Sequence, residues 1–141
     1  MTAPPTFASS SLLVALGGGL GAWLRYITSR AWLSAIGPVA ATAFPWATLT
    51  ANVLGSLAMG LLVGWLARHG TPGGILGGEA WRLLLGVGVL GGYTTFSSFA
   101  LEFALFIERG ALGAAALYVG TSLVAGFLAL FAGLALMRSL A

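Results

Sequence analysis

The chain contains no cysteine, no lysine and no aspartate, and only 6% of its 141 residues are charged. The absence of cysteine excludes metal sites with thiolate ligands. It also means that the sequence does not indicate whether the protein lies in an oxidising or a reducing compartment. With a single histidine, His69, and no pair of carboxylates on one face, the sequence assembles no catalytic constellation. We therefore predict that the protein is not an enzyme. A soluble domain carries about a quarter charged residues, and this chain has too few to cover a water-facing surface.

Hydrophobic residues make up 59% of the chain and gather in four long segments. A helix needs about 20 apolar residues to span a bilayer, and each segment is that long. We predict an all-α integral membrane protein with four transmembrane helices in a single domain, residues 1–141, with membrane lipid as its solvent. The predicted spans are 10–31, 46–67, 81–107 and 112–137.

The third segment carries a polar run, residues 90–102, that a regular helix in hydrocarbon would not tolerate. Irregular backbone at membrane depth occurs only where it is buried in protein or lines a polar cavity. We predict that the helix breaks after Gly91 and Gly92, and that this run is the functional centre. A break frees backbone carbonyls, which are good ligands for a small hard cation. The run 86–91 matches G-x-G-x-x-G, but no strand precedes it, so a dinucleotide site is rejected.

Two further helices carry polar side chains at helical spacing. Thr48, Asn52 and Ser56 share one face of the second segment. Asn52 is either an interhelical hydrogen-bond partner or a donor that faces a pore. Tyr118 and Ser122 lie one turn apart on the fourth segment, and they are likewise either interhelical hydrogen-bonding residues or part of a polar track.

The first segment places Gly17, Gly21 and Arg25 one turn apart. Small residues at this spacing let helix backbones approach closely. Arg25 either extends to the lipid headgroups or is a structural charge that holds a neighbouring loop or helix end. The apolar residues 33–45 are predicted to form a loop that lies on the membrane interface.

The net charge of +3 comes from six arginines and three glutamates. Membrane flanks are basic, so this charge does not indicate a nucleic-acid partner. The positive-inside rule needs a charge bias to set orientation, and alternating helices give three arginines on each side. We therefore predict insertion in both orientations, which suits an antiparallel dimer. The two groups are Arg68, Arg82 and Arg138 on the side of the termini, and Arg25, Arg30 and Arg109 on the other.

Three motifs on three of the predicted helices resemble the Fluc/CrcB family of fluoride channels, and they occur in the family's order. Together with the length and the four-helix plan, the resemblance covers essentially the whole chain. The motifs are Gly18-Gly19-x-Gly21-Ala22-x-x-Arg25-Tyr26, Thr48-Leu49-x-x-Asn52-x-x-Gly55-Ser56 and Gly91-Gly92-x-Thr94-Thr95-Phe96-Ser97-x-Phe99-x-x-Glu102.

The resemblance implies an antiparallel, dual-topology homodimer in a bacterial or archaeal inner membrane. It also implies two pores that export fluoride and a central structural sodium ion. Carried over residue by residue, the family's roles fall on positions in all four helices. The pore residues would be Thr48, Asn52, Phe96, Phe99, Glu102, Tyr118 and Ser122, the structural arginine would be Arg25, and sodium would bind the backbone carbonyls of Gly91 and Thr94 from both subunits.

The chemistry of fluoride agrees with these residue types. Fluoride is small and tightly hydrated, so a pore must replace its water with donors such as amides and hydroxyls. The alternative is a small dual-topology multidrug exporter, whose mechanism needs a carboxylate in the first helix, and the first segment has none. A non-transporting scaffold subunit would not explain a polar break flanked by two phenylalanines.

Overall fold

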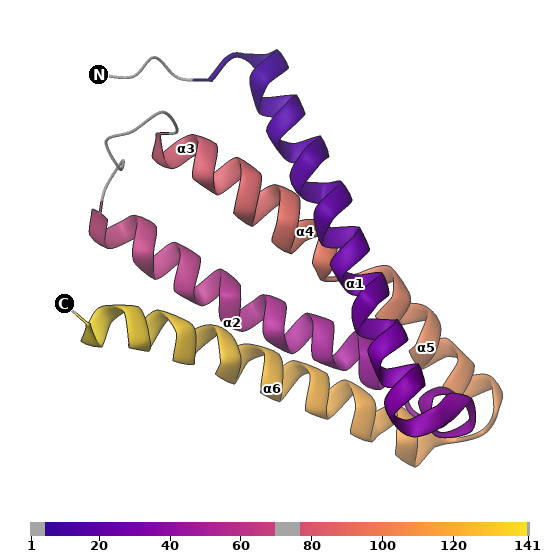
Figure 1. Ribbon diagram of the computed structural model, residues 1–141. Helices are drawn as coiled ribbons and strands as arrows, with labels where there is room; N and C mark the ends of the chain where they lie inside the picture. The colour runs from indigo at the N-terminus through magenta and orange to yellow at the C-terminus, as the bar shows by residue number, and fades with distance from the viewer. Residues whose placement is uncertain (1–4, 70–76, 141) are drawn as a thin grey trace.

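The computed structural model describes residues 5–69 and 77–140, and all regular structure within these ranges is helical (Figure 1). Four helical spans are long and apolar enough to cross a membrane, and the third is bent. The predicted all-α class, the four spans and the broken third helix are therefore confirmed. The elements are α1 (Phe7–Ala43), α2 (Trp46–His69), α3 (Gly78–Trp81), η1 (Arg82–Leu90), α4 (Gly91–Tyr93), α5 (Phe96–Glu108) and α6 (Leu112–Ser139).

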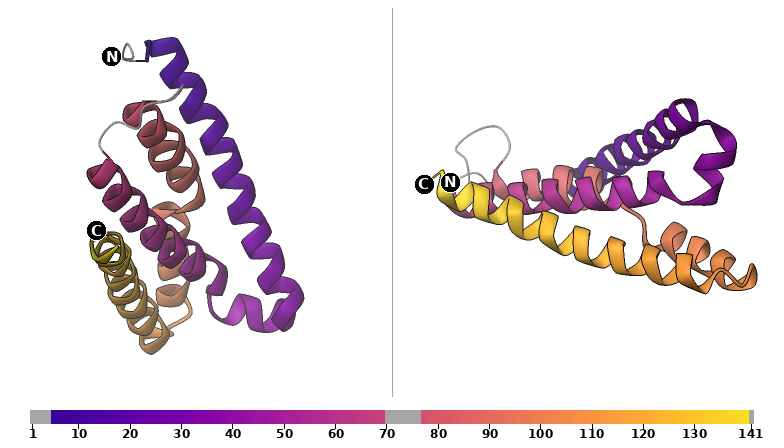
Figure 2. Two further views of the ribbon diagram at one scale, coloured as in Figure 1. Left: turned by 60° about the vertical axis from the view of Figure 1, so that its left-hand side comes forward. Right: turned by 90° about the horizontal axis from the view of Figure 1, so that it is seen from below.

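The four spans run in alternating directions. The start of α1 and the end of α6 lie at the same end of the bundle, and the α5–α6 turn lies at the opposite end (Figures 1 and 2). The third span is a chain of four elements, α3, η1, α4 and α5, of which η1 and α4 pack along α1 and α2. Figure 2 shows α5 leaving that direction and approaching α6.

Helix α1 runs beyond its predicted span, because residues 33–43 are helical rather than a loop. The helix is kinked at Gly37, whose φ of 77° lies in the left-handed region that glycine adopts without steric penalty. Pro38 follows, and proline suits the first turn of a new helix because its missing N–H has no partner there. The predicted interfacial loop is therefore a kink followed by a short helical segment.

Helix α1 packs backbone to backbone on η1 and α4 along a line of glycines, which we name the first glycine seam. A Cβ atom on Gly88 would lie 2.9 Å from the Cα of Gly17, and one on Gly92 would lie 3.0 Å from the Cα of Gly18. Both distances are shorter than ordinary van der Waals contacts. The seam confirms that glycines in the first and third segments serve close packing.

A second glycine seam joins α2 to α6. A Cβ atom on Gly60 would lie 3.0 Å from the amide nitrogen of Leu134, and one on Gly133 would lie 2.8 Å from that of Leu61. Arg68 closes the same interface at its end, where its guanidinium donates to the carbonyls of Met137 (3.1 Å) and Leu140 (2.7 Å). These carbonyls lie at the C-terminal end of α6, where the last carbonyls of a helix have no hydrogen-bond partner within the helix.

Candidate functional site

The break in the third span lies at Thr94 and Thr95, one residue beyond the predicted position directly after Gly92. Gly91 still has helical torsion angles (φ −63°, ψ −37°), whereas Thr94 and Thr95 are extended. The threonine side chains define both ends of the break. The Thr94 hydroxyl donates to the carbonyl of Leu90 (2.9 Å), and the Thr95 hydroxyl accepts from the amide of Ser98 (3.2 Å) as the N-cap of α5. The break follows the capping hydroxyls rather than the glycines.

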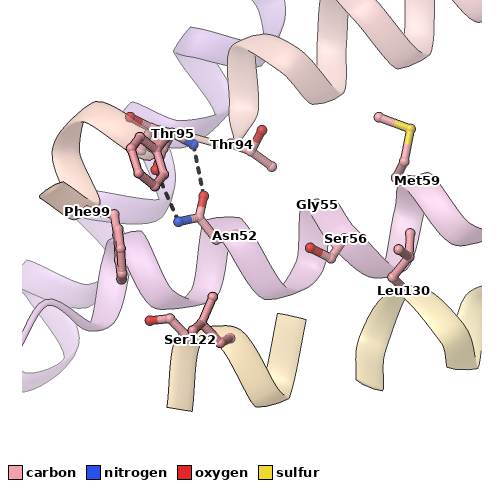
Figure 3. Close-up of a pocket in the computed structure, with 11 residues that line it drawn as sticks. Asn52, Gly55, Ser56, Met59, Thr94, Thr95, Phe99, Ser122 and Leu130 are labelled. Carbon is pink, nitrogen blue, oxygen red and sulfur yellow. Dashed lines mark hydrogen bonds between the residues drawn. The ribbon is translucent and has the colours of Figure 1, made fainter. Parts of the chain in front are cut away.

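Asn52 on α2 holds the break through two hydrogen bonds (Figure 3). Its Oδ1 accepts from the Thr95 amide (2.8 Å), and its Nδ2 donates to the Thr95 carbonyl (3.1 Å). Both backbone groups of an extended residue thus find partners at membrane depth, where an unpaired group is costly. Asn52 makes the interhelical contact that was one alternative, and it also lines the cavity described next.

Gly55, one turn beyond Asn52, leaves room for the side chain of Thr94. A Cβ atom on Gly55 would collide with the Thr94 methyl group. The second segment therefore approaches the break through an asparagine that bonds it and a glycine that makes space for it. Sequence reasoning identified both residues within one motif but did not predict which part of the break each contacts.

A cavity of about 430 Å³ lies beside the break, between α2, α5 and α6, and we name it the break cavity. The Ser122 hydroxyl borders it and is buried. Among the described residues, this oxygen is the one buried side-chain polar atom without a hydrogen-bond partner. The cavity is lined by Asn52, Gly55, Ser56, Met59, Thr94, Thr95, Phe96, Phe99, Ser122, Leu123 and Leu130 (Figure 3).

The two predicted pore phenylalanines both line the break cavity. The ring centroids of Phe96 and Phe99 lie 5.8 Å apart, as expected for residues on one face of a helix. Phe96 is 79% exposed in the single chain. The ring of Phe99 in turn contacts that of Tyr118 at 5.1 Å, so a line of aromatic rings leaves the cavity along α5.

One turn further along α5, the carboxylate of Glu102 bridges two helices. It accepts hydrogen bonds from the Thr48 hydroxyl on α2 (2.6 Å) and from the Tyr118 hydroxyl on α6 (2.5 Å). Tyr118 is fully buried and Thr48 is nearly so. The sequence identified all three residues, and the structure brings them together at one carboxylate.

A second cavity of about 400 Å³ begins at this carboxylate, and we name it the end cavity. Thr48 and Glu102 line it, whereas Asn52 and Phe99, one turn away on the same two helices, line the break cavity. The two cavities are thus successive along α2 and α5. The end cavity is lined by Ser29, Trp32, Leu33, Ala41, Thr42, Pro45, Ala47, Thr48, Glu102, Leu105, Phe106 and Arg109.

Two aromatic residues that sequence reasoning missed complete the surroundings of Tyr118. The rings of Phe106 and Phe44 lie 6.0 and 5.6 Å from the Tyr118 ring. The helix face of Phe106 could have been predicted from the sequence, because Phe106 lies seven residues after Phe99 and therefore on the same face. The contact of Phe44 was not, because it depends on the kink at the end of α1.

The structure places the remaining predicted residues without assigning their roles. Arg25 is half-buried on α1, one turn beyond Gly21, and its guanidinium makes no hydrogen bond or ion pair with the described residues. Gly91 is exposed in the single chain and Thr94 is half-buried at the break.

A family model described as "CrcB-like protein, Camphor Resistance (CrcB)" matches residues 12–134. The chain belongs to the CrcB family. A CrcB relative from Novosphingobium aromaticivorans is 53% identical over 133 residues, which is 94% of this chain and 99% of the relative. A Sphingopyxis alaskensis protein is 52% identical over 127 residues, which is 90% of this chain and 94% of the relative.

Both relatives, and a third from Rhodospirillum centenum at 53% identity over 128 residues (91% of this chain and 94% of the relative), are named fluoride-specific ion channel FluC. Ion channels are not enzymes, so the relatives agree with the prediction of a protein without catalytic activity. Together with the four apolar helical spans, membership of the CrcB family makes this a multi-pass membrane protein. The resemblance read from the three motifs is confirmed.

Proposed function

We propose that the protein is a fluoride-selective channel that exports fluoride across a bacterial inner membrane and thereby lowers its cytoplasmic concentration. The observation that carries the proposal is the unpartnered, buried hydroxyl of Ser122 in a cavity bordered by Asn52 and two phenyl rings. A buried polar atom without a partner is uncommon and is explained if a transported ion is its partner. The names of the relatives support fluoride as that ion.

The donors around the break cavity suit a small, tightly hydrated anion. The Ser122 hydroxyl is one donor. The Asn52 amide group has two N–H bonds, and Thr95 uses one of them, so the other is available for the ion. The edges of the Phe96 and Phe99 rings carry partial positive charge. None of these groups is a full cation, so the site can release the ion as well as hold it.

The route from the break cavity follows α5. Beyond Phe99 the next turn presents Glu102 with its two hydroxyl partners, Thr48 and Tyr118. Both hydroxyls donate to the carboxylate and so compensate part of its charge, and the end cavity continues the route beyond it. We assign the pore to this sequence of two cavities separated by one helical turn.

The working unit we propose is an antiparallel, dual-topology homodimer with two pores. The arginine balance of three against three supports insertion in both orientations. The 79% exposed ring of Phe96 and the exposed Gly91 support a partner on the face of the break. A second chain on that face would cover one open side of each break cavity.

We also propose a structural sodium ion between the two breaks. In a continuous α-helix the amides of Thr95 and Ser98 would bond the carbonyls of Gly91 and Thr94. Here Thr95 donates to Asn52, and Ser98 donates to the Thr95 hydroxyl. The carbonyls of Gly91 and Thr94 are therefore suited to a cation. When bound, sodium would supply a fixed positive charge at the dimer axis.

Efflux from liposomes loaded with fluoride, chloride or a quaternary ammonium dye tests the transported species. We expect fluoride efflux alone. Efflux of the dye in exchange for protons would instead indicate the multidrug exporter, although α1 lacks the carboxylate that this mechanism needs. Chloride efflux as fast as fluoride efflux would contradict fluoride selectivity.

Topology is tested separately with a C-terminal reporter that is active on one side of the membrane only. We expect reporters of opposite specificity to be active in equal measure. A single orientation would contradict the antiparallel dimer without contradicting fluoride transport by some other assembly.

A further inference from the structure

The end cavity has one basic side chain in its wall, Arg109 at the C-terminus of α5. Glu102, Leu105, Phe106 and Arg109 all line this cavity, and their spacing places them on a single face of the helix. The cavity therefore has an arginine at one end of this face and a glutamate about two helical turns deeper. Arg109 is exposed and follows the last residue of α5.

The other hydrogen-bond donors among the side chains of this wall are already used. Each has a single side-chain N–H or O–H, and each donates it to an oxygen of the protein. These donors are Ser29 to the Arg25 carbonyl (3.2 Å), Trp32 to the Thr50 hydroxyl (3.0 Å), Thr42 to the Pro38 carbonyl (2.9 Å) and Thr48 to the Glu102 carboxylate (2.6 Å).

Arg109, in contrast, keeps its donors. Its guanidinium makes no hydrogen bond or ion pair with the described part of the chain, even though Glu108 is its neighbour in sequence. The only ion pair in residues 5–69 and 77–140 joins Arg82 to Glu79. Among the side chains that line the end cavity, Arg109 is therefore the one with donors and a positive charge available to an incoming anion.

We propose that Arg109 collects fluoride at the mouth of the end cavity and so increases the rate at which the anion enters the pore. This inference rests on the proposed channel function and adds a residue that determines rate. A charge in a cleft raises the local concentration of ions of opposite sign and accelerates their association. Because Arg109 lies at the exposed mouth rather than beside Ser122, it attracts the anion without holding it inside the pore.

The position also offsets the negative charge of Glu102. Hydroxyl groups contact both carboxylate oxygens, but the carboxylate still lies at the inner end of the end cavity. An anion that enters without Arg109 would meet only this negative charge. Arg109 therefore acts on conduction through electrostatics and has no role in distinguishing fluoride from chloride.

Single-channel fluoride current in planar bilayers tests the proposal, because the current per channel does not depend on how many channels insert. Variants Arg109→Gln, Arg109→Lys and Arg109→Glu are compared with the wild type. Arg30→Gln is the matched control: it removes an arginine from the same predicted side of the membrane, and Arg30 lines neither cavity. Both glutamine variants thus change the arginine balance equally.

The salt dependence distinguishes electrostatic attraction from a structural role. The screening length falls from about 30 Å at 0.01 M to about 3 Å at 1 M ionic strength. We expect Arg109→Gln to lower the current about threefold at about 10 mM salt, which is less than the roughly 10- to 10³-fold effect of a cleft lined by charges of one sign, because a single charge is removed. The loss should disappear when an impermeant salt is added to about 1 M. Arg109→Lys should retain the wild-type current, and Arg109→Glu should lower it further.

Two results would overturn the proposal. One is an Arg109→Gln current equal to that of Arg30→Gln at low salt. The other is an equal loss at low and high salt, which would indicate that Arg109 only stabilises the end of α5. A wild-type channel that carries no fluoride current would overturn the proposed function itself, so the two failures are distinguishable.

Discussion

The glycine seams and the region around α5 show two different ways of joining helices in one small membrane protein. In the first glycine seam, backbones touch with no side chain between them, as at Gly17 and Gly88. Around α5, helices are joined through side chains, as where Glu102 bridges Thr48 and Tyr118. Both cavities border α5. Aromatic rings and hydroxyl groups between helices keep the helices apart and leave cavities with polar walls. Glycines let the backbones touch and leave no room for a cavity.

The glycine seams hold the fold together, whereas the region around α5 forms the proposed route of the ion. The glycine seams fix η1 and α4 against α1, and α2 against α6. The first seam thereby holds the helix end that precedes the break, and the second holds α2, whose Asn52 bonds Thr95. Helix α5 continues from the break and borders both cavities. Substitutions in the seams should therefore act on folding, and substitutions around α5 should act on flux. Single substitutions in the two regions test this division.

Gly21→Ala should destabilise the protein most. The added Cβ would meet the backbone of Val89 and Tyr93, with the Tyr93 amide nitrogen at 2.7 Å, and backbone cannot move aside as a side chain can. Overpacking costs about 1–3 kcal/mol and occasionally more, and we expect the upper end. The monodisperse fraction in detergent after heating measures the effect. Gly19→Ala is the control, since nothing lies within 4 Å of a Cβ there; equal stability of the two variants would contradict the seam.

Asn52→Ala should nearly abolish fluoride flux. It leaves the Thr95 amide and carbonyl without partners, and each unsatisfied group costs about 1–3 kcal/mol, so the break should lose its position. Asn52→Asp keeps the acceptor for the Thr95 amide but removes the donor and adds a negative charge to the anion route. That charge costs several kcal/mol if it stays ionised. Liposome efflux measures both, and wild-type flux in both would show that Asn52 contributes only to packing.

Phe96→Ile and Phe99→Ile should lower flux while leaving the fold intact. Isoleucine keeps an apolar side chain but removes the electropositive ring edge. Apolar swaps of similar volume usually cost less than about 1.5 kcal/mol, so thermal stability should change little. Phe103→Ile is the control on the same helix, because Phe103 lines neither cavity. If all three variants retain wild-type flux, the rings are only hydrophobic filling and the proposed route is wrong.

Ser122→Ala should have the smallest effect on stability. We expect stability to stay the same or rise slightly, whereas flux should fall. Removing a buried hydroxyl that has no partner should leave stability unchanged or raise it by about 1 kcal/mol, since the desolvation penalty disappears. Flux should fall, because the break cavity loses a donor. Thr121→Ala is the control, since the Thr121 hydroxyl donates to the Leu117 carbonyl (2.7 Å). Unchanged flux in Ser122→Ala would contradict the observation on which the proposed function rests.

Much of the fold was predictable because its signals are local. The four spans follow from the length and hydropathy of each segment, and the break follows from hydroxyls and glycines inside an apolar run. The exact position of the break was not predictable from glycine content. Gly91 and Gly92 remain helical, and the extended residues are the two threonines whose side chains cap the adjoining helices. Gly92 stays helical because it packs against the backbone of Gly18, and the helix ends where the capping hydroxyls begin.

The sequence by itself determined the membrane class and the four helices, and its resemblance to the CrcB family pointed to the residues of the candidate pore. Only the tertiary structure decided which of these residues meet. Asn52 bonds Thr95 across 43 positions of sequence, Thr48 bonds Glu102 across 54, and the partner of Tyr118 is the same carboxylate. Helical periodicity places a side chain on a face of its own helix. The partner of that side chain depends on the rotation and depth of another helix, which the glycine contacts between distant segments set.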